Sequence, residues 1–94
     1  MMNNKYELDF TTAFSKDLKK AKKRGYNMKL MSTVVDKLQT GEPLEAKYKD
    51  HPLTGNWVGY RECHIMPDWL LIYKIYEDKL LLVLTRTGTH SDLF

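Results

Sequence analysis

The stretch WLLIYKIYEDKLLLVLTRT, residues 69–87, decides the fold of this 94-residue chain. It contains two apolar segments, 69–76 and 80–87, which are rich in the aliphatic and aromatic residues that strands prefer. The charged link between them, Glu77-Asp78-Lys79, is short enough for a hairpin. We therefore predict two antiparallel strands, and the nearly continuous apolar run in the first predicts burial on both of its faces.

Upstream of this hairpin, residues 57–65 form a third strand-like segment, which Met66-Pro67-Asp68 joins to it. Because so short a link also forces antiparallel pairing, we predict a three-stranded meander. Between residues 42 and 55, two prolines, a glycine and scattered charges show neither helical nor strand periodicity. This pattern predicts an unusually long loop, of the kind that often carries function.

The first half of the chain predicts one strand and two helices. Apolar and charged residues alternate over residues 6–10, as in a strand with one buried face. Two helical stripes follow and end at Gly25 and Gly41; their predicted N-caps are Thr11 or Thr12 and Asn27. The order β-α-α-β-β-β predicts an α+β fold over residues 1–94, a two-layer sandwich with a helical hairpin packed on a mainly antiparallel sheet. The other face of the sheet is expected to stay open as a concave site.

The composition is that of one ordinary globular domain, with 43% apolar and 29% charged residues. No apolar run approaches the ~20 residues needed to span a bilayer, so no membrane contact is expected. The first residues lack the apolar core and cleavage site of a secretory signal. The lone cysteine, Cys63, cannot form an internal disulfide. A reducing cytoplasm is therefore the expected location.

The net charge of +3 conceals an uneven distribution. Residues 1–49 carry +5, from eleven Lys and Arg against six acidic residues, and residues 50–94 carry −2, from four against six. Most of the excess lies in the first predicted helix, on Lys16, Lys19, Lys20, Lys22, Lys23 and Arg24. This run either forms a solvated helix face or attracts phosphates or an acidic protein.

All three histidines, His51, His64 and His90, lie in the second half of the chain, and Asp68 follows His64 in the next turn. Histidine changes charge near neutral pH, so imidazoles that share a cleft can supply a general acid and a general base. Taken singly, each histidine could equally be a solvated or a structural residue. The meander places Asp68 at one edge of the sheet, within reach of the loop and the tail that carry the other two histidines.

Other catalytic classes find no support in the sequence. No spacing of His, Cys or Glu matches a zinc motif, and no glycine-rich loop could cradle phosphates. Ser91 lacks a nucleophile elbow, and Cys63 is expected to pack in the core. We therefore predict neither a metal nor a cofactor.

Aromatic and basic residues accompany the histidines: Trp57, Tyr60, Trp69, Tyr73, Phe94, Arg61 and Arg86. Aromatic rings can stack on unpaired RNA bases, and guanidinium groups can bind phosphates. Core packing is the competing explanation for Trp57, Tyr73 and Trp69. Phe94 ends a glycine-containing tail and is the better candidate for stacking on a base. Because RNA supplies its own 2′-hydroxyl nucleophile, such groups suffice for a ribonuclease that needs no metal.

These residues lie in motifs that resemble the YafQ branch of the RelE/ParE toxin superfamily. The motifs are YKDHPLTGNW (48–57), GYRECHI (59–65), PDWLLIY (67–73) and RTGTHSDLF (86–94), with SKD (15–17) in the first helix. The resemblance covers nearly the whole chain and implies the same β-α-α-β-β-β order in a single toxin domain.

The resemblance also implies a type II toxin that enters the ribosomal A site, cleaves messenger RNA there and is held inactive by a cognate antitoxin. The catalytic group that it implies consists of His51, His64, Asp68 and His90. It places Arg86 near the phosphate, with Trp69 and Phe94 helping to shape the site.

Roles within this group follow as expectations. His90, on a terminal segment, is expected to be the general acid, and His51 or His64, polarised by Asp68, the base. The basic run of the first helix is expected to contact ribosomal RNA, with an affinity that falls as salt rises.

Two other functions stay open. One is a non-enzymatic, gyrase-poisoning toxin of the same fold, although such toxins generally lack this histidine group. The other is a plain RNA-binding module, which would leave the histidines unexplained. The expected antitoxin is an acidic, partly disordered chain of the ribbon-helix-helix type that covers the basic surface and folds as it binds, so DNA would be contacted only through it.

Overall fold

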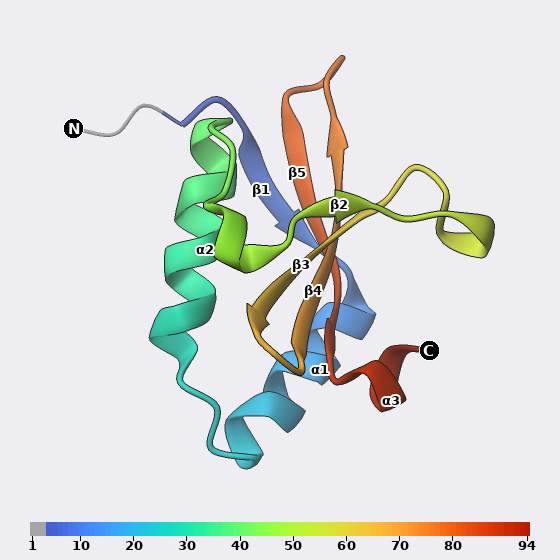
Figure 1. The fold of residues 1–94 in the computed structure, drawn as a ribbon. Helices are drawn as coiled ribbons and strands as arrows, with labels where there is room; N and C mark the ends of the chain where they lie inside the picture. The colour runs from blue at the N-terminus through green and yellow to red at the C-terminus, as the bar shows by residue number, and fades with distance from the viewer. Residues whose placement is uncertain (1–3) are drawn as a thin grey trace.

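The computed structural model describes residues 4–94, and residues 1–3 lie outside the described part. The elements are β1 (Glu7–Phe10), α1 (Thr12–Lys23), α2 (Met28–Thr40), η1 (Ala46–Tyr48), β2 (His51–Pro52), η2 (Gly55–Trp57), β3 (Arg61–Met66), β4 (Trp69–Tyr76), β5 (Leu81–Gly88) and α3 (His90–Leu93). Helices α1 and α2 pack on a five-stranded sheet, so the predicted α+β sandwich is confirmed (Figure 1). No helix within residues 4–94 is both long and apolar enough to cross a membrane.

The sheet has the strand order β1-β5-β4-β3-β2. Strand β1 runs parallel to β5, and the other three neighbouring pairs are antiparallel. Two of these pairs, β3 with β4 and β4 with β5, form the predicted meander. Strand β4 lies at the centre, and its residues Leu70, Leu71 and Ile72 are fully buried although successive side chains point to opposite faces. The predicted burial of this strand on both faces is therefore confirmed.

Local sequence sets the limits of the two long helices. Thr11 accepts a hydrogen bond from the backbone N–H of Phe14 at the start of α1, and Asn27 accepts one from Lys29 at the start of α2. Helix α2 ends at Gly41, whose φ of +81° lies in the left-handed region that glycine adopts without strain. The predicted capping residues and the predicted stop are thus the ones observed.

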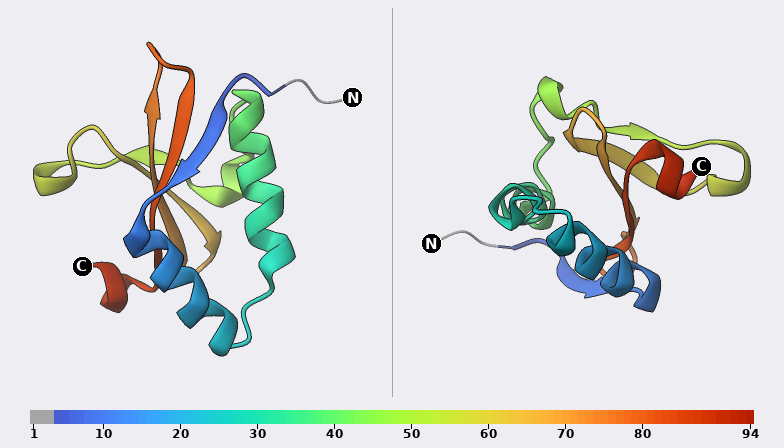
Figure 2. Two further views of the ribbon diagram at one scale, coloured as in Figure 1. Left: turned by 180° about the vertical axis from the view of Figure 1, so that it is seen from behind. Right: turned by 90° about the horizontal axis from the view of Figure 1, so that it is seen from below.

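The two long helices lie on one side of the sheet (Figure 2), and one apolar core lies between them and the sheet. Buried side chains of α1 and α2 meet the helix-facing residues of the central strands there, among them Cys63, Leu71, Tyr73, Leu82 and Leu84. Burial raises the pKa of the Cys63 thiol, which favours the unreactive protonated form. The predicted placement of this cysteine in the core is confirmed.

Several boundaries differ from the prediction. The strand expected over residues 57–65 begins only at Arg61, because Gly55 and Gly59 adopt positive φ angles (+63° and +92°) and the chain forms η2. The long loop contains β2, a two-residue strand that pairs with β3. Helix α3 was not predicted.

Strand β1 is not buried on one face as predicted. Leu8 and Phe10 are 43% and 57% exposed, and only Tyr6, just before the strand, is buried. The reason is that β1 lies at the edge of the sheet, where its side chains fall outside the apolar core that the helices cover.

Candidate active site

The register of the sheet gathers most of the predicted site residues on the face opposite α1 and α2. Residues paired across neighbouring strands point to the same face. One cross-strand row consists of His51, Glu62, Ile72 and Arg86, and the next consists of His64, Leu70 and Gly88. His90 follows two residues later, at the start of α3. We call the group of His51, Glu62, His64, Arg86 and His90 the histidine face.

The three imidazoles lie next to one another. The ring centroids of His51 and His64 are 6.5 Å apart, and those of His64 and His90 are 5.9 Å apart. They come from β2, β3 and α3, three segments that only the folded chain brings together. The structure thus places the three predicted histidines in one cluster.

Glu62 is the acidic residue that contacts His51 and His64, and sequence reasoning missed it. Its carboxylate is 3.3 Å from Nε2 of His51 and 3.5 Å from Nε2 of His64, and the residue is only 4% exposed. The two-residue spacing of Glu62 and His64 on a strand could have signalled a shared face. The contact with His51 could not be found, because it depends on the unpredicted strand β2.

Asp68 contacts His90 and no other histidine within residues 4–94. Its Oδ1 accepts hydrogen bonds from the backbone N–H of His90 and from Nδ1 of the same residue, both at 3.1 Å. These bonds, the backbone one foremost, lower the pKa of the Asp68 carboxyl. The expectation that Asp68 polarises His51 or His64 is therefore wrong, because Glu62 occupies that position. With Nδ1 of His90 donating to Asp68, Nε2 is the nitrogen available to a substrate.

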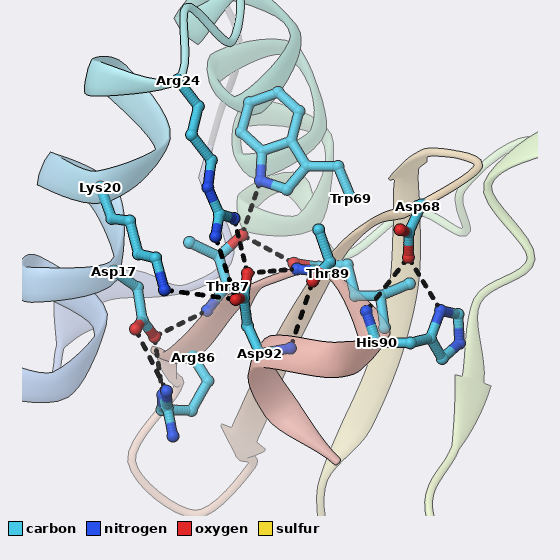
Figure 3. A network of polar contacts seen from close by, with 11 residues as sticks. Asp17, Lys20, Arg24, Asp68, Trp69, Arg86, Thr87, Thr89, His90 and Asp92 are labelled. Atoms are coloured by element: carbon cyan, nitrogen blue, oxygen red, sulfur yellow. Dashed lines mark hydrogen bonds and ion pairs between the residues drawn. The ribbon is translucent and has the colours of Figure 1, made fainter.

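Arg86 lies in the row of Glu62, but its guanidinium reaches α1 and is already paired there. Nε and Nη2 donate to Asp17 of α1 at 2.6 and 3.1 Å (Figure 3). This ion pair raises the pKa of Arg86. The remaining nitrogen, Nη1, makes no hydrogen bond within residues 4–94 and can donate to a phosphate.

Two aromatic rings border the cluster on the side of α3. Phe94 is 60% exposed, and its ring centroid lies 6.3 Å from that of His90 and 6.4 Å from that of Trp57. Trp57 also meets Tyr60 edge-on at 5.3 Å. The exposed Phe94 ring is therefore placed where a base next to His90 could stack.

Two residues expected to bind RNA lie elsewhere. Trp69 is 3% exposed, because its indole packs against Tyr26 and donates a hydrogen bond to Thr87. Arg61 precedes Glu62 on β3, so it points to the helix side of the sheet, where it pairs with Asp50 at 3.3 Å. The predicted RNA contact of Trp69 is therefore wrong, because its ring is buried, whereas that of Arg61, whose side chain is 39% exposed, stays a prediction. Trp69 is a core residue, and Arg61 faces away from the histidines.

The basic run of α1 divides into two groups. Lys20 and Arg24 pair with Asp92 of α3, at 3.3 Å and 2.6 Å (Figure 3). The other four make no ion pair within residues 4–94 and are exposed: Lys16, Lys19, Lys22 and Lys23. Only this second group forms the solvated positive surface that the sequence suggested.

One part of the histidine face could also hold a cation. A ligand atom from each of His51, Glu62 and His64 lies within 4.8 Å of the others. Two imidazoles and a carboxylate suit transition ions such as Zn²⁺ or Cu²⁺, although zinc sites usually have a fourth ligand. Beside His64, a hollow of about 390 Å³ is lined by Leu30, Lys47, Tyr48, Lys49, Ile65, Met66 and Pro67.

The chain matches the model of one protein family over residues 6–94, described as the bacterial toxin of a type II toxin-antitoxin system, YafQ. It is 47% identical to the mRNA interferase toxin YafQ of Escherichia coli K12 over 89 residues, which cover 94% of this chain and 95% of that protein. A toxin YafQ of Haemophilus influenzae, named as putative, is 36% identical over 90 residues (90% and 88% coverage).

Solved structures agree with these matches. The crystal structure of the E. coli DinJ-YafQ toxin-antitoxin complex superposes with a TM-score of 0.88 at 44% identity, covering 96% of this chain and 98% of that chain. A metal-bound toxin from Helicobacter pylori superposes with a TM-score of 0.90 at 46% identity, covering 95% and 99%.

Proposed function

Because this chain belongs to the YafQ family of type II toxins, we propose that it is an mRNA interferase that cuts messenger RNA on its histidine face. The observation that carries this proposal is the cluster of three adjacent imidazoles with two carboxylates, Glu62 and Asp68, in contact with them. The name of the E. coli relative, an mRNA interferase, supports it.

The proposed chemistry needs one base, one acid and a positive group. His51 or His64, whose Nε2 faces Glu62, uses Nδ1 to remove the proton from the 2′-hydroxyl, whose oxygen forms a bond to phosphorus. Nδ1 lies 3.1 Å from the Pro52 carbonyl oxygen in His51 and 3.4 Å from the Pro67 carbonyl oxygen in His64, and the hydroxyl takes the place of that contact. His90, held by Asp68, protonates the 5′-oxygen as its bond to phosphorus breaks. Nη1 of Arg86 stabilises the negative charge of the transition state. One proton is removed and one is donated, so the proposed reaction needs no metal ion.

The proposed setting is the A site of a translating ribosome in the cytoplasm. The four free lysines of α1 would bind ribosomal RNA, and the histidine face would meet the messenger. A cognate antitoxin is proposed as the protein partner, as DinJ is for the E. coli toxin in its complex. An acidic chain of the ribbon-helix-helix type suits the basic surface of α1, and any DNA contact would be made by the antitoxin.

Ribosome binding is expected to depend on salt through these lysines. Replacing Lys16, Lys19, Lys22 and Lys23 by glutamine should weaken binding and flatten the plot of log affinity against log salt by about 0.7–0.9 for each phosphate that a lysine no longer neutralises. Sedimentation with ribosomes at several salt concentrations measures the affinity and its salt dependence. Lys79→Gln removes one charge at the opposite end of the molecule and serves as the control, so it should leave ribosome binding unchanged. Salt-independent binding of the unmodified toxin would contradict the proposed contact.

Primer extension on messenger RNA tests the proposed function. Purified toxin should produce new 5′ ends on a translated message, should produce far fewer on the same message without ribosomes, and should produce none when the antitoxin is added. A gyrase-poisoning toxin would leave the message intact and instead trap gyrase on cleaved DNA. A plain RNA-binding module would bind the message without cutting it.

A further inference from the structure

Helix α3, which carries His90, cannot hold its position by itself. It has four residues, far fewer than the ~12–15 at which an isolated helix becomes marginally stable, and none of them is buried. The position of the His90 imidazole therefore depends on contacts that anchor α3 to the rest of the molecule.

Asp92 makes most of these contacts. Its Oδ2 accepts a hydrogen bond from Arg24 Nη1 at 2.6 Å, and also one from the backbone N–H of Thr89 at 2.9 Å that caps α3 itself. Its Oδ1 accepts from Arg24 Nη2 at 3.1 Å and from Lys20 Nζ at 3.3 Å. Figure 3 shows these contacts of Asp92 with α1 and with Thr89. The Asp92 side chain is only 16% exposed, which strengthens these charge-assisted bonds relative to a surface pair.

Asp92 also sits directly on the end of β5. A Cβ atom at Gly88 would lie 2.9 Å from Asp92 Oδ2 and 3.0 Å from Asp92 Cβ, so only glycine leaves room for this approach. The Asp92 carboxylate therefore lies between the end of β5 and the side of α1, and its contacts hold α3 against both elements. The bond to Arg24, followed by the one to Thr89, holds the pKa of Asp92 far below its usual range.

His90 lies two residues before Asp92 in the same turn, and Asp68 holds it from the other side. We infer that Asp92, together with Arg24 and Lys20, is a positioning device that fixes His90 beside His64 on the histidine face. This inference rests on the proposed nuclease function. It assigns Arg24 and Lys20 an intramolecular role that differs from the ribosome contact of the neighbouring lysines.

Matched variants test the inference through the rate of mRNA cutting at varied ribosome concentration. Asp92→Asn keeps an oxygen for the Thr89 cap but removes the charge, and Arg24→Gln removes the other half of the ion pair. Both should lower the maximal rate by about 10–100-fold, as a displacement of about 1 Å does, and leave the half-saturating ribosome concentration unchanged. Arg24→Lys keeps a cation and should retain most of the rate that Arg24→Gln loses. The variant that combines Asp92→Asn with Arg24→Gln should cut no more slowly than the slower of the two single variants, because both remove the same ion pair.

Two controls separate positioning from other roles. Lys23→Gln removes the same charge one position earlier on the chain and should raise only the half-saturating ribosome concentration. Ser91→Ala changes α3 where no side-chain hydrogen bond exists within the described residues and should change nothing. Hydrogen exchange of the His90 amide, which donates to Asp68, should accelerate in Asp92→Asn but not in Ser91→Ala.

The inference is overturned if Asp92→Asn and Arg24→Gln cut at the full maximal rate, or if their defect is confined to ribosome affinity as in Lys23→Gln. An unchanged His90 amide in Asp92→Asn overturns it as well. Failure of the unmodified toxin to cut would instead refute the proposed function, and amide exchange would still decide whether Asp92 holds His90.

Discussion

Replacing His90 by alanine is expected to stop mRNA cutting and to abolish growth arrest in cells that express the toxin. His90 is proposed as the group that protonates the departing 5′-oxygen, and losing such a group costs about 10²–10⁴-fold in rate. Its side chain is 57% exposed, so the substitution should leave the fold unchanged. Single-turnover cutting on programmed ribosomes and a thermal unfolding curve measure the two effects.

The neighbouring Ser91→Ala variant serves as the control, since Ser91 is exposed and follows His90 in α3. A His90→Ala toxin that retains full toxicity would remove His90 from the mechanism. Loss of activity together with loss of folding would show that His90 is a structural residue instead.

Replacing Glu62 by glutamine is expected to lower the cutting rate by about 10²–10⁴-fold, because the imidazole that acts as the base loses its carboxylate partner. The free energy of unfolding should stay the same or rise. The change removes the cost of desolvating the 4%-exposed carboxylate, and the amide oxygen of Gln can still accept a hydrogen bond from His51 or His64, so no buried charge is left without a partner. The same variant should therefore be less active and no less stable.

Glu45→Gln is the matched control, since Glu45 is exposed and its side chain caps nothing. Single-turnover rates and chemical denaturation of both variants give the comparison. If Glu62→Gln cut at the rate of the control, Glu62 would be a bystander of the two histidines.

Periodicity in the sequence was sufficient to predict the sheet and the two long helices. Alternation and apolar runs mark strands of six to eight residues such as β3, β4 and β5, and helical spacing marks α1 and α2. A strand of two residues and a helix of four are too short to show any period, so β2 and α3 could not be found in this way. For α3 a local signal did exist, the capping-box spacing of Thr89 and Asp92.

The histidines could be predicted as a cluster, but their partners could not. The pairing of Asp68 with His90 depends on where α3 begins, and the contact of Glu62 with His51 depends on β2. The burial of Trp69 shows the same limit, since nothing in its sequence neighbourhood separates a ring that packs on Tyr26 from one that stacks on RNA. Which residues contact the histidines, and whether Trp69 is buried, is decided only when the helices pack on the sheet.

The chemical nature of the new RNA ends tests most directly whether the histidine face cuts by attack of the 2′-hydroxyl. That reaction leaves a 5′-hydroxyl on the downstream fragment and a 2′,3′-cyclic or 3′-phosphate on the upstream one. The downstream fragment should therefore become ligatable to an RNA adaptor only after treatment with polynucleotide kinase and ATP. A downstream fragment that ligates directly, and so carries a 5′-phosphate, would contradict the account, because it would show that water attacked the phosphorus.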